Sequence, residues 1–214
     1  MRGIFITFEG CDGSGKSTQM KRLHTRLLQL GIDVVLTREP GGTPTGELIR
    51  DLLLDPNGPD RTALTETFLY AASRAELAKR ILQPALEDGK VVLLERYVDS
   101  TLVYQGMAGG IPIRDIEHIN RIATYGLIPD LTLVFDIVDP HVLHQRMAPK
   151  KKDRIESRDE AYHARVREGY RVLSERYPER IRLIDGELPQ NEVEEIVFRE
   201  VWSILERREG GKMS

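Results

Sequence analysis

Short apolar runs rich in β-branched residues alternate along this chain with longer stretches of helical periodicity, and no other feature constrains the fold as strongly. The alternation is typical of βαβ units, in which parallel strands form one sheet that helices cover on both faces. The expected strands span residues 4–9, 34–37, 91–95, 131–136 and 181–184. The expected helices span residues 46–54, 64–82, 99–107, 113–125, 142–147, 160–177 and 192–208.

The sequence gives specific signals for where two helices end. Another helix is expected after the first strand, where Met20, Leu23, Leu27 and Leu30 recur at helical spacing as its apolar face. Gly31 is the expected C-terminal stop of this helix. Pro84 should interrupt the helical stretch that ends near residue 88, because proline lacks the backbone N–H that a helix interior needs.

The length and charge indicate one domain without a general affinity for polyanions. A chain of 214 residues suits a single domain, expected over residues 1–209, followed by a flexible tail at 210–214. The 31 Lys and Arg residues nearly balance 34 Asp and Glu residues, so the net charge of −3 predicts no nucleic-acid partner and no membrane partner. No apolar stretch approaches the roughly 18 residues that a membrane span requires. The N-terminus has no signal-peptide pattern and Cys11 is the only cysteine, so a cytoplasmic protein is expected.

A glycine-rich segment lies between the first expected strand and the helix after it. Residues 10–17 match the P-loop pattern of glycine, four residues, glycine, lysine and serine or threonine. In such a loop, backbone N–H groups converge on phosphate oxygens, Lys16 reaches the β and γ phosphates, and Ser17 can ligate Mg²⁺. The alternative is a turn that merely joins a strand to a helix, but this position is the context that supports a P-loop.

We therefore expect ATP or GTP binding and a three-layer α/β P-loop fold, with a five-stranded parallel sheet flanked by helices. The residues expected to bind the triphosphate are Gly10, Cys11, Asp12, Gly13, Ser14, Gly15, Lys16, Ser17 and Thr18.

Two further polar segments follow expected strands. Residues 38–43, Arg-Glu-Pro-Gly-Gly-Thr, come after the second strand, and residues 95–97, Glu-Arg-Tyr, come after the third. Both therefore fall at the carboxyl edge of the sheet, where open α/β sheets bind their ligands. The chain contains no Asn-Lys-x-Asp sequence, which weighs against a GTPase and favours a kinase.

Several segments occur in a fixed order along the chain: Phe8-Glu9-Gly10, Thr37-Arg38-Glu39-Pro40-Gly41-Gly42-Thr43, Gly46-Glu47-x-Ile49-Arg50, Ala71-Ala72-x-Arg74 and Arg96-Tyr97-x-Asp99-Ser100-x-Leu102-x-Tyr104-Gln105-Gly106. Together they resemble the thymidylate kinase family, and the resemblance runs from residue 4 to about residue 156. The resemblance implies transfer of the γ-phosphoryl group of ATP to thymidine monophosphate (dTMP) with Mg²⁺, which makes dTDP for dTTP and DNA precursor synthesis. It also implies a homodimer built from helices on one side of the sheet.

A monophosphate acceptor requires cations beside the γ-phosphate of ATP. Arg50 and Arg96 are similar to the family's acceptor-phosphate ligands, and surface salt bridging is the alternative for each. Glu95 stands where the family has Asp; a carboxylate there can position Mg²⁺, and the extra methylene changes its distance from the metal. The expected catalytic residues are Lys16, Glu95, Arg96 and a lid arginine, and the expected Mg²⁺ ligands are Ser17 and Glu95.

For the base, Tyr70 and Arg74 lie four residues apart and so project from one helix face. The ring can stack on a pyrimidine and the guanidinium can donate to a carbonyl oxygen such as O4; alternatively, Tyr70 is a core aromatic where the family usually has Phe. By the resemblance, Gln105 faces the base, Tyr104 crowds the sugar 2′ position, and Asp12 lies near the 3′-hydroxyl unless it only caps its turn. The residues expected to bind dTMP are Asp12, Glu39, Arg50, Tyr70, Arg74, Arg96, Thr101, Tyr104 and Gln105.

Five cations in the nine residues 146–154 predict a basic lid loop over about residues 147–156. Such a loop can close over the triphosphate, exclude water and supply a cation to the transition state, and the alternative is a solvated charged loop. The family places this cation in the P-loop or in the lid, and with Gly13 after Asp12 the resemblance implies the lid. Arg154 is the first candidate and Arg146 the second. Spacing does not rank the remaining lid cations, Lys150, Lys151 and Lys152.

Two other functions stay open at this stage. A kinase for another nucleoside monophosphate would share the P-loop and the lid and would differ in the base pocket. A P-loop regulatory ATPase would hydrolyse ATP slowly without any monophosphate. No covalent intermediate is expected, and Cys11 and the five histidines show no ligand spacing, so no zinc site is expected.

Overall fold

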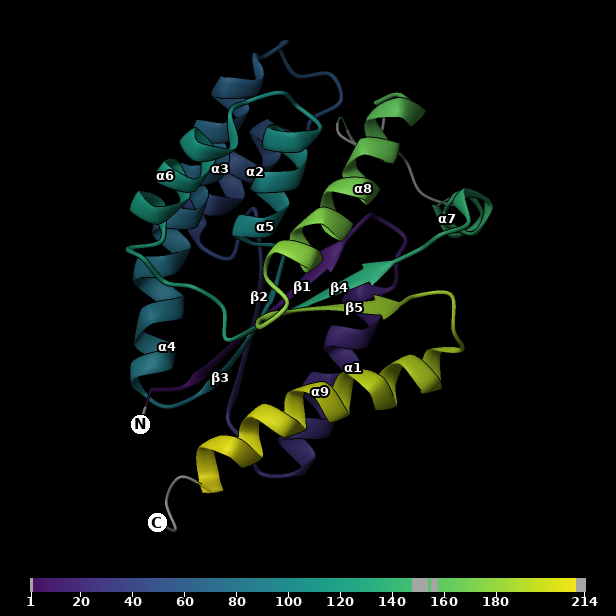
Figure 1. Cartoon of the computed structure of the whole chain (residues 1–214). Coiled ribbons are helices and arrows are strands. Elements are labelled where there is room, and N and C mark those ends of the chain that lie inside the picture. The colour runs from purple at the N-terminus through teal and green to yellow at the C-terminus, as the bar shows by residue number, and fades with distance from the viewer. Residues whose placement is uncertain (1, 148–153, 155–157, 211–214) are drawn as a thin grey trace.

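A five-stranded parallel sheet forms the centre of this computed structural model, which describes residues 2–147, 154 and 158–210. The strands, in the spatial order β2-β3-β1-β4-β5 (Figure 1), are β1 (Ile4–Gly10), β2 (Val34–Arg38), β3 (Val91–Glu95), β4 (Leu131–Asp136) and β5 (Ile181–Asp185). In the central register, Phe8 of β1 pairs with Glu95 of β3 and with Leu133 of β4. The carboxyl ends of β1, β3 and β4 therefore reach one edge of the sheet together.

Helices cover both faces of the sheet, which makes three layers (Figure 1). They are α1 (Lys16–Gln29), α2 (Pro44–Leu54), α3 (Ala63–Leu77), α4 (Gln83–Glu87), α5 (Val98–Thr101), α6 (Ile113–Ala123), α7 (Pro140–Met147), α8 (Glu160–Arg176) and α9 (Gln190–Gly210), with π-helical turns η1 (Ala78–Leu82) and η2 (Leu102–Met107). Helices α1 and α9 share one face, and α3, α4, α5 and α8 lie on the other.

Successive side chains of β1 point to opposite faces of the sheet, so this strand contributes to the core on both faces. Ile4, Ile6 and Phe8 join the buried cluster formed with α1 and α9, whereas Phe5 joins a cluster with η1 and α4. On that second face, Val134 of β4 packs into the cluster that contains α8 and η2. Residues of opposite parity point to opposite faces of a strand, so the central strand is buried on both sides.

The expected strands are confirmed, each within one residue of its observed bounds. The helix expected at 64–82 is present as α3 followed by η1, and the helix expected at 99–107 is α5 followed by η2. Pro84 does not end the helical stretch: it lies in the first turn of α4, directly after the π-helical turn η1. The wider turn lets the chain stay helical past a residue that has no N–H to donate.

The first helix ends one residue earlier than its apolar pattern predicted. Met20, Leu23 and Leu27 are buried, but Leu30 is the C-terminal cap of α1 and is 51% exposed, so its assignment to the apolar face was wrong. Gly31 follows with φ 77°, a left-handed conformation that favours glycine and stops the helix as expected. At the other end of the chain, residue 210 belongs to α9, and residues 211–214 of the expected tail lie outside the described residues.

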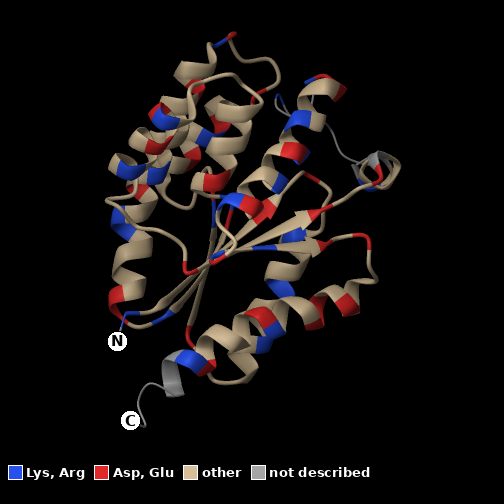
Figure 2. Cartoon of the chain, in the orientation of Figure 1, with Lys and Arg blue, Asp and Glu red and all other residues tan. Residues whose placement is uncertain are grey.

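Charged residues of both signs are interspersed along the helices (Figure 2), as the near-zero net charge leads one to expect. No helix in the described part of the chain is long and apolar enough to cross a membrane.

Candidate active site

The P-loop connects the carboxyl end of β1 to the N-terminus of α1. Its first glycine, Gly10, has φ 130°, and a Cβ at this position would lie 2.5 Å from the carbonyl oxygen of Phe135 in the adjacent strand. Gly15 has φ 96° and caps α1, which begins at Lys16. The close approach and the left-handed conformations explain why glycine is needed at these positions. The loop therefore presents the positive N-terminus of α1 at the sheet edge, where anions bind favourably.

Lys16, Ser17 and Glu95 meet beside this loop. The Lys16 ammonium donates to the carbonyl oxygen of Cys11 (3.1 Å) and lies 3.8 Å from Glu95 Oε1. Ser17 Oγ donates to the same Glu95 oxygen at 2.7 Å. The longer side chain of Glu95 thus reaches the P-loop serine directly. A hydroxyl and a carboxylate at this separation, beside a phosphate-binding loop, are oxygen ligands that fit Mg²⁺.

Asp12 joins the P-loop to Arg96. Its Oδ1 accepts hydrogen bonds from Arg96 Nη2 (2.7 Å) and Lys16 Nζ (3.2 Å). Burial raises the pKa of Asp12, but the two cations outweigh burial and hold the pKa below its usual range. A cation expected to bind the acceptor phosphate and a cation expected to bind ATP therefore meet at one carboxylate oxygen.

A pocket opens at the carboxyl edge of β1 and β3, and all the residues expected to bind dTMP line it. The pocket is lined by Asp12, Arg38, Glu39, Pro40, Arg50, Leu54, Tyr70, Arg74, Glu95, Arg96, Ser100, Thr101, Tyr104 and Gln105. Sequence reasoning had not assigned Arg38, Pro40, Leu54 or Ser100. Arg38, Pro40 and Ser100 adjoin assigned residues and lie within the segments that carry the family resemblance, and this was the signal that could have found them.

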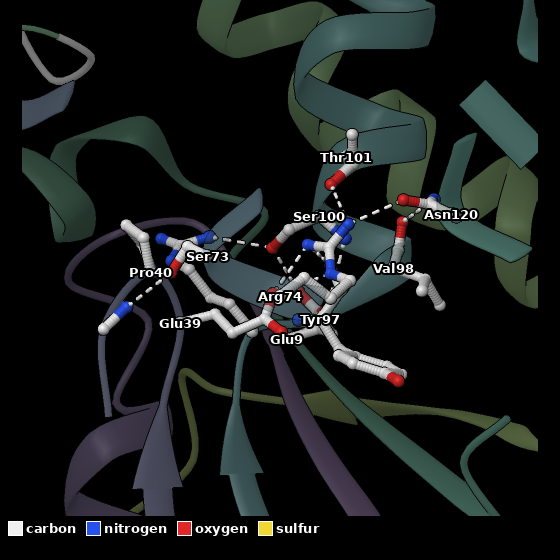
Figure 3. A network of polar contacts seen from close by, with 12 residues as sticks. Glu9, Glu39, Pro40, Ser73, Arg74, Tyr97, Val98, Ser100, Thr101 and Asn120 are labelled. Carbon is white, nitrogen blue, oxygen red and sulfur yellow. Dashed lines mark hydrogen bonds and ion pairs between the residues drawn. The ribbon is translucent and has the colours of Figure 1, made fainter. Parts of the chain in front are cut away.

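Arg74 lies in the pocket wall at the centre of a buried polar network (Figure 3). Its guanidinium donates to Glu39 Oε2 (2.8 Å), Thr101 Oγ1 (2.8 Å), Asn120 Oδ1 (2.6 Å) and the Tyr97 carbonyl oxygen (3.0 Å). A second nitrogen, Nη2, lies 2.7 Å from Glu39 Oε2, so all the guanidinium nitrogens have protein partners. Burial raises the pKa of Glu39 to about 7, against the lowering effect of Arg74. A thymine O4 atom would have to share one of these donors, and this role of Arg74 stays a prediction.

Tyr104 and Gln105 belong to η2 rather than to an α-helix. The expected common face of Thr101, Tyr104 and Gln105 assumed α-helical spacing, yet the π-helical turn still leaves all three on the pocket wall. Arg96 contacts Tyr104 twice: Nη1 donates to its hydroxyl at 3.3 Å, and the guanidinium carbon lies 5.2 Å from the ring centroid. The ring of Tyr104 and the guanidinium of Arg96, which is expected to bind the acceptor phosphate, therefore lie side by side.

The two lid arginines have other partners in this structure. Arg154 pairs with Asp60 (3.0 Å) and with Glu66 (3.4 Å), which lie before and within α3. Arg146, on α7, donates to the carbonyl oxygen of Gly186 at 3.0 Å. The three lid lysines fall outside the described residues. The transition-state role expected for a lid arginine therefore stays a prediction.

Comparisons with known proteins agree on one family. The family model described as thymidylate kinase matches residues 8–197. The thymidylate kinase of Symbiobacterium thermophilum is 46% identical over 205 residues, covering 96% of this chain and 95% of that protein. The thymidylate kinase of an Exiguobacterium strain is 48% identical over 188 residues, covering 87% of this chain and 88% of that protein. The crystal structure of thymidylate kinase from Ehrlichia chaffeensis superposes with a TM-score of 0.75 at 32% identity, covering 96% of this chain and 99% of that one.

Proposed function

The chain belongs to the thymidylate kinase family, and from this premise we propose that it transfers the γ-phosphoryl group of ATP to dTMP. Members of this family use nucleotide substrates. The transfer is direct and in line, so the protein contributes positioning and electrostatic stabilisation rather than covalent chemistry. The product, dTDP, would serve dTTP and DNA precursor synthesis.

One observation carries the proposal: the Asp12 carboxylate lies between Arg96 of the pocket and Lys16 of the P-loop. An acceptor phosphate held by Arg96 and Arg50 would adjoin a γ-phosphate held by Lys16. Such adjacency supports direct transfer, because proximity and orientation can supply several kcal/mol of the barrier reduction. A P-loop switch protein does not need a second, arginine-lined anion site beside its triphosphate.

Ser17 and Glu95 are the residues that would hold Mg²⁺. When bound, Mg²⁺ supplies positive charge to the phosphate oxygens of ATP. Lys16 neutralises the β and γ oxygens from the P-loop side, and Arg96 neutralises the acceptor phosphate from the pocket side. A lid cation, with Arg154 the first candidate, would complete the charge balance in the transition state.

We propose that three other residues of the pocket recognise the base. Tyr70 offers an aromatic platform, Gln105 offers an amide to the base edge, and Arg74 offers only donors. A donor-only group that shares one of its hydrogen bonds with the base suits the O4 carbonyl of thymine, whereas the amino group of cytosine would offer it no acceptor. Purine monophosphates would not fit in this pocket.

We also propose a homodimer built from α2, α3 and α6, which lie together on one side of the sheet (Figure 1). These helices carry large apolar side chains open to solvent, including Leu48 (73% exposed), Phe68 (55%) and Ile122 (63%). Sedimentation should give a particle of about twice the 24.4 kDa of the chain. A stable monomer at micromolar concentration would exclude the dimer. The cytoplasmic location and the single domain over residues 1–209 stay predictions.

The decisive experiment measures ADP formation with ATP and Mg²⁺ across a panel of nucleoside monophosphates. A thymidylate kinase is nearly silent without an acceptor and is fastest with dTMP. Preference for AMP, GMP or CMP over dTMP would leave a kinase of different specificity. Slow ATP hydrolysis that no monophosphate accelerates would instead favour a regulatory ATPase.

A further inference from the structure

Glu9 is a buried carboxylate that no part of the proposed reaction uses. It lies on β1, immediately before the P-loop, and is 0% exposed. We propose that Glu9 is a positioning residue that orients Arg96 toward the acceptor phosphate; this inference rests on the proposed function. Glu9 does not touch the pocket, and it acts through the backbone and through one serine hydroxyl.

The backbone around Arg96 gives the first argument. Arg96 has φ 65°, a left-handed conformation that is uncommon outside glycine and persists only where surrounding contacts enforce it. The Arg96 N–H donates to the Phe8 carbonyl oxygen at 2.9 Å, and the Tyr97 N–H donates to Glu9 Oε1 at 2.7 Å. Two consecutive residues of β1 therefore hold the peptide groups on either side of Arg96.

The Ser100 hydroxyl gives the second argument (Figure 3). Ser100 Oγ donates to Glu9 Oε2 at 2.6 Å, and Arg96 Nη1 donates to Ser100 Oγ at 3.3 Å. A hydroxyl has one hydrogen, so its donation to Glu9 leaves the lone pairs of Ser100 free to accept from Arg96. The chain of hydrogen bonds from Arg96 through Ser100 to Glu9 thus fixes one side of the guanidinium, while Asp12 fixes the other.

Four donors point at the two carboxyl oxygens of Glu9. Beyond Tyr97 N–H and Ser100 Oγ, it accepts from the Ser100 N–H (3.3 Å) and from the Tyr170 hydroxyl (2.9 Å). Burial and the nearby Asp99 carboxylate raise the pKa of Glu9, and the hydrogen bonds and Arg96 oppose that rise. Asp99 itself is paired with Arg180 through two contacts of 2.7 Å. A glutamine at position 9 keeps the shape but directs an NH₂ group at donors.

The test is a double-mutant cycle between Glu9→Gln and Arg96→Lys, with kcat and KM measured for dTMP and for ATP. Arg96→Lys alone should lower kcat/KM for dTMP by about 100-fold, since lysine lacks the planar fork of arginine. Glu9→Gln alone should lower it by about 10- to 100-fold and leave the KM for ATP within about twofold. In the Glu9→Gln background, Arg96→Lys should lower kcat/KM for dTMP by less than about 10-fold, because an arginine that is already misplaced contributes little to acceptor binding.

Asp130→Asn is the matched control. Asp130 Oδ2 accepts the Phe5 N–H at 2.8 Å, near the opposite end of the same strand. This substitution should leave kcat/KM for dTMP within about twofold and should be additive with Arg96→Lys, as expected for distant sites.

Additive costs for Glu9→Gln and Arg96→Lys would overturn the inference, as would a rise in the KM for ATP that matches the loss toward dTMP. If Glu9→Gln does not melt cooperatively, Ser100→Ala takes its place in the cycle. This substitution removes the hydroxyl that links Glu9 to the Arg96 side chain and leaves the contact of Glu9 with the Tyr97 N–H in place. The same double-mutant cycle can be measured without turnover, from the dissociation constants for dTMP that titration calorimetry gives. A wild type that prefers another monophosphate would refute the proposed substrate, and the cycle would then be run with that acceptor.

Discussion

Replacing Arg74 by alanine should destabilise the folded protein as well as weaken base recognition. The side chain is 1% exposed and its main partner, Glu39, is buried with it. Removing one member of a buried ion pair costs about 3–5 kcal/mol, because the remaining carboxyl must either stay charged without its partner or take up a proton. Against a typical stability of about 5–15 kcal/mol, Arg74→Ala should leave a folded but visibly weakened protein.

The cost should also depend on pH. The pKa of Glu39 is about 7 with Arg74 present, and Arg74 lowers it, so Arg74→Ala should raise it further. A carboxyl whose folded pKa exceeds its unfolded pKa loses stability as pH rises from the unfolded value to the folded one. Above pH 7 the wild type lies above the folded pKa of Glu39, so it loses no further stability from this group. Arg74→Ala still lies below its raised folded pKa and continues to lose stability. The difference in unfolding free energy should therefore grow by up to about 1.4 kcal/mol per pH unit.

Equilibrium urea unfolding, followed by far-UV circular dichroism at pH 7, 8 and 9, measures both effects. Arg50→Ala is the matched control, since Arg50 also lines the pocket but is only partly buried, and its guanidinium donates to the Pro40 carbonyl oxygen at 2.9 Å rather than to a carboxylate. Its loss should cost about 1 kcal/mol or less. The double variant Glu39→Gln/Arg74→Ala should show no pH-dependent excess over the wild type.

A decrease of less than about 1 kcal/mol in the free energy of unfolding for Arg74→Ala would refute this reasoning, because removing one member of a buried ion pair should cost more than this. A loss that stays constant from pH 7 to pH 9 would refute the assignment of the pH effect to Glu39. The first result, combined with a large drop in kcat/KM for dTMP, would make Arg74 a base ligand without a structural role.

Three further predictions follow from the site. Lys16→Ala should reduce turnover below roughly a tenth of wild type while the protein still melts cooperatively, and steady-state kinetics with a thermal melt test this. Arg154→Ala should lower kcat and barely move the KM for dTMP, since a transition-state cation acts where charge develops; an unchanged kcat with a raised KM for ATP would make Arg154 a ground-state ligand. Deoxyuridine monophosphate should be poorer than dTMP by roughly 10- to 200-fold in kcat/KM, since it lacks only the 5-methyl group, and equal values would show that the pocket does not enclose that methyl.

Local patterns predicted the strands and the P-loop, and the resemblance to the thymidylate kinase family predicted most of the residues that line the pocket. Strand β1 could be recognised from residues 4–9 alone, because an apolar run before a glycine-rich loop needs no distant partner to identify it. Lys16, Glu95 and Arg96 could be placed at one edge because each lies at or after the carboxyl end of an expected parallel strand. These inferences depend on backbone periodicity and on the geometry of parallel sheets.

Only the tertiary structure decided what the buried polar side chains do. Arg74 donates to Glu39, Tyr97, Thr101 and Asn120, which come from three separate segments, and no local pattern pairs them with Arg74. The contact of Glu9 with Ser100, the π-helical turn after Leu77 and the pairing of Arg154 with Glu66 are likewise products of packing. Hydrophobic periodicity can be read directly from the sequence. The partner of a buried charge, in contrast, depends on which distant segments the fold brings within hydrogen-bonding distance.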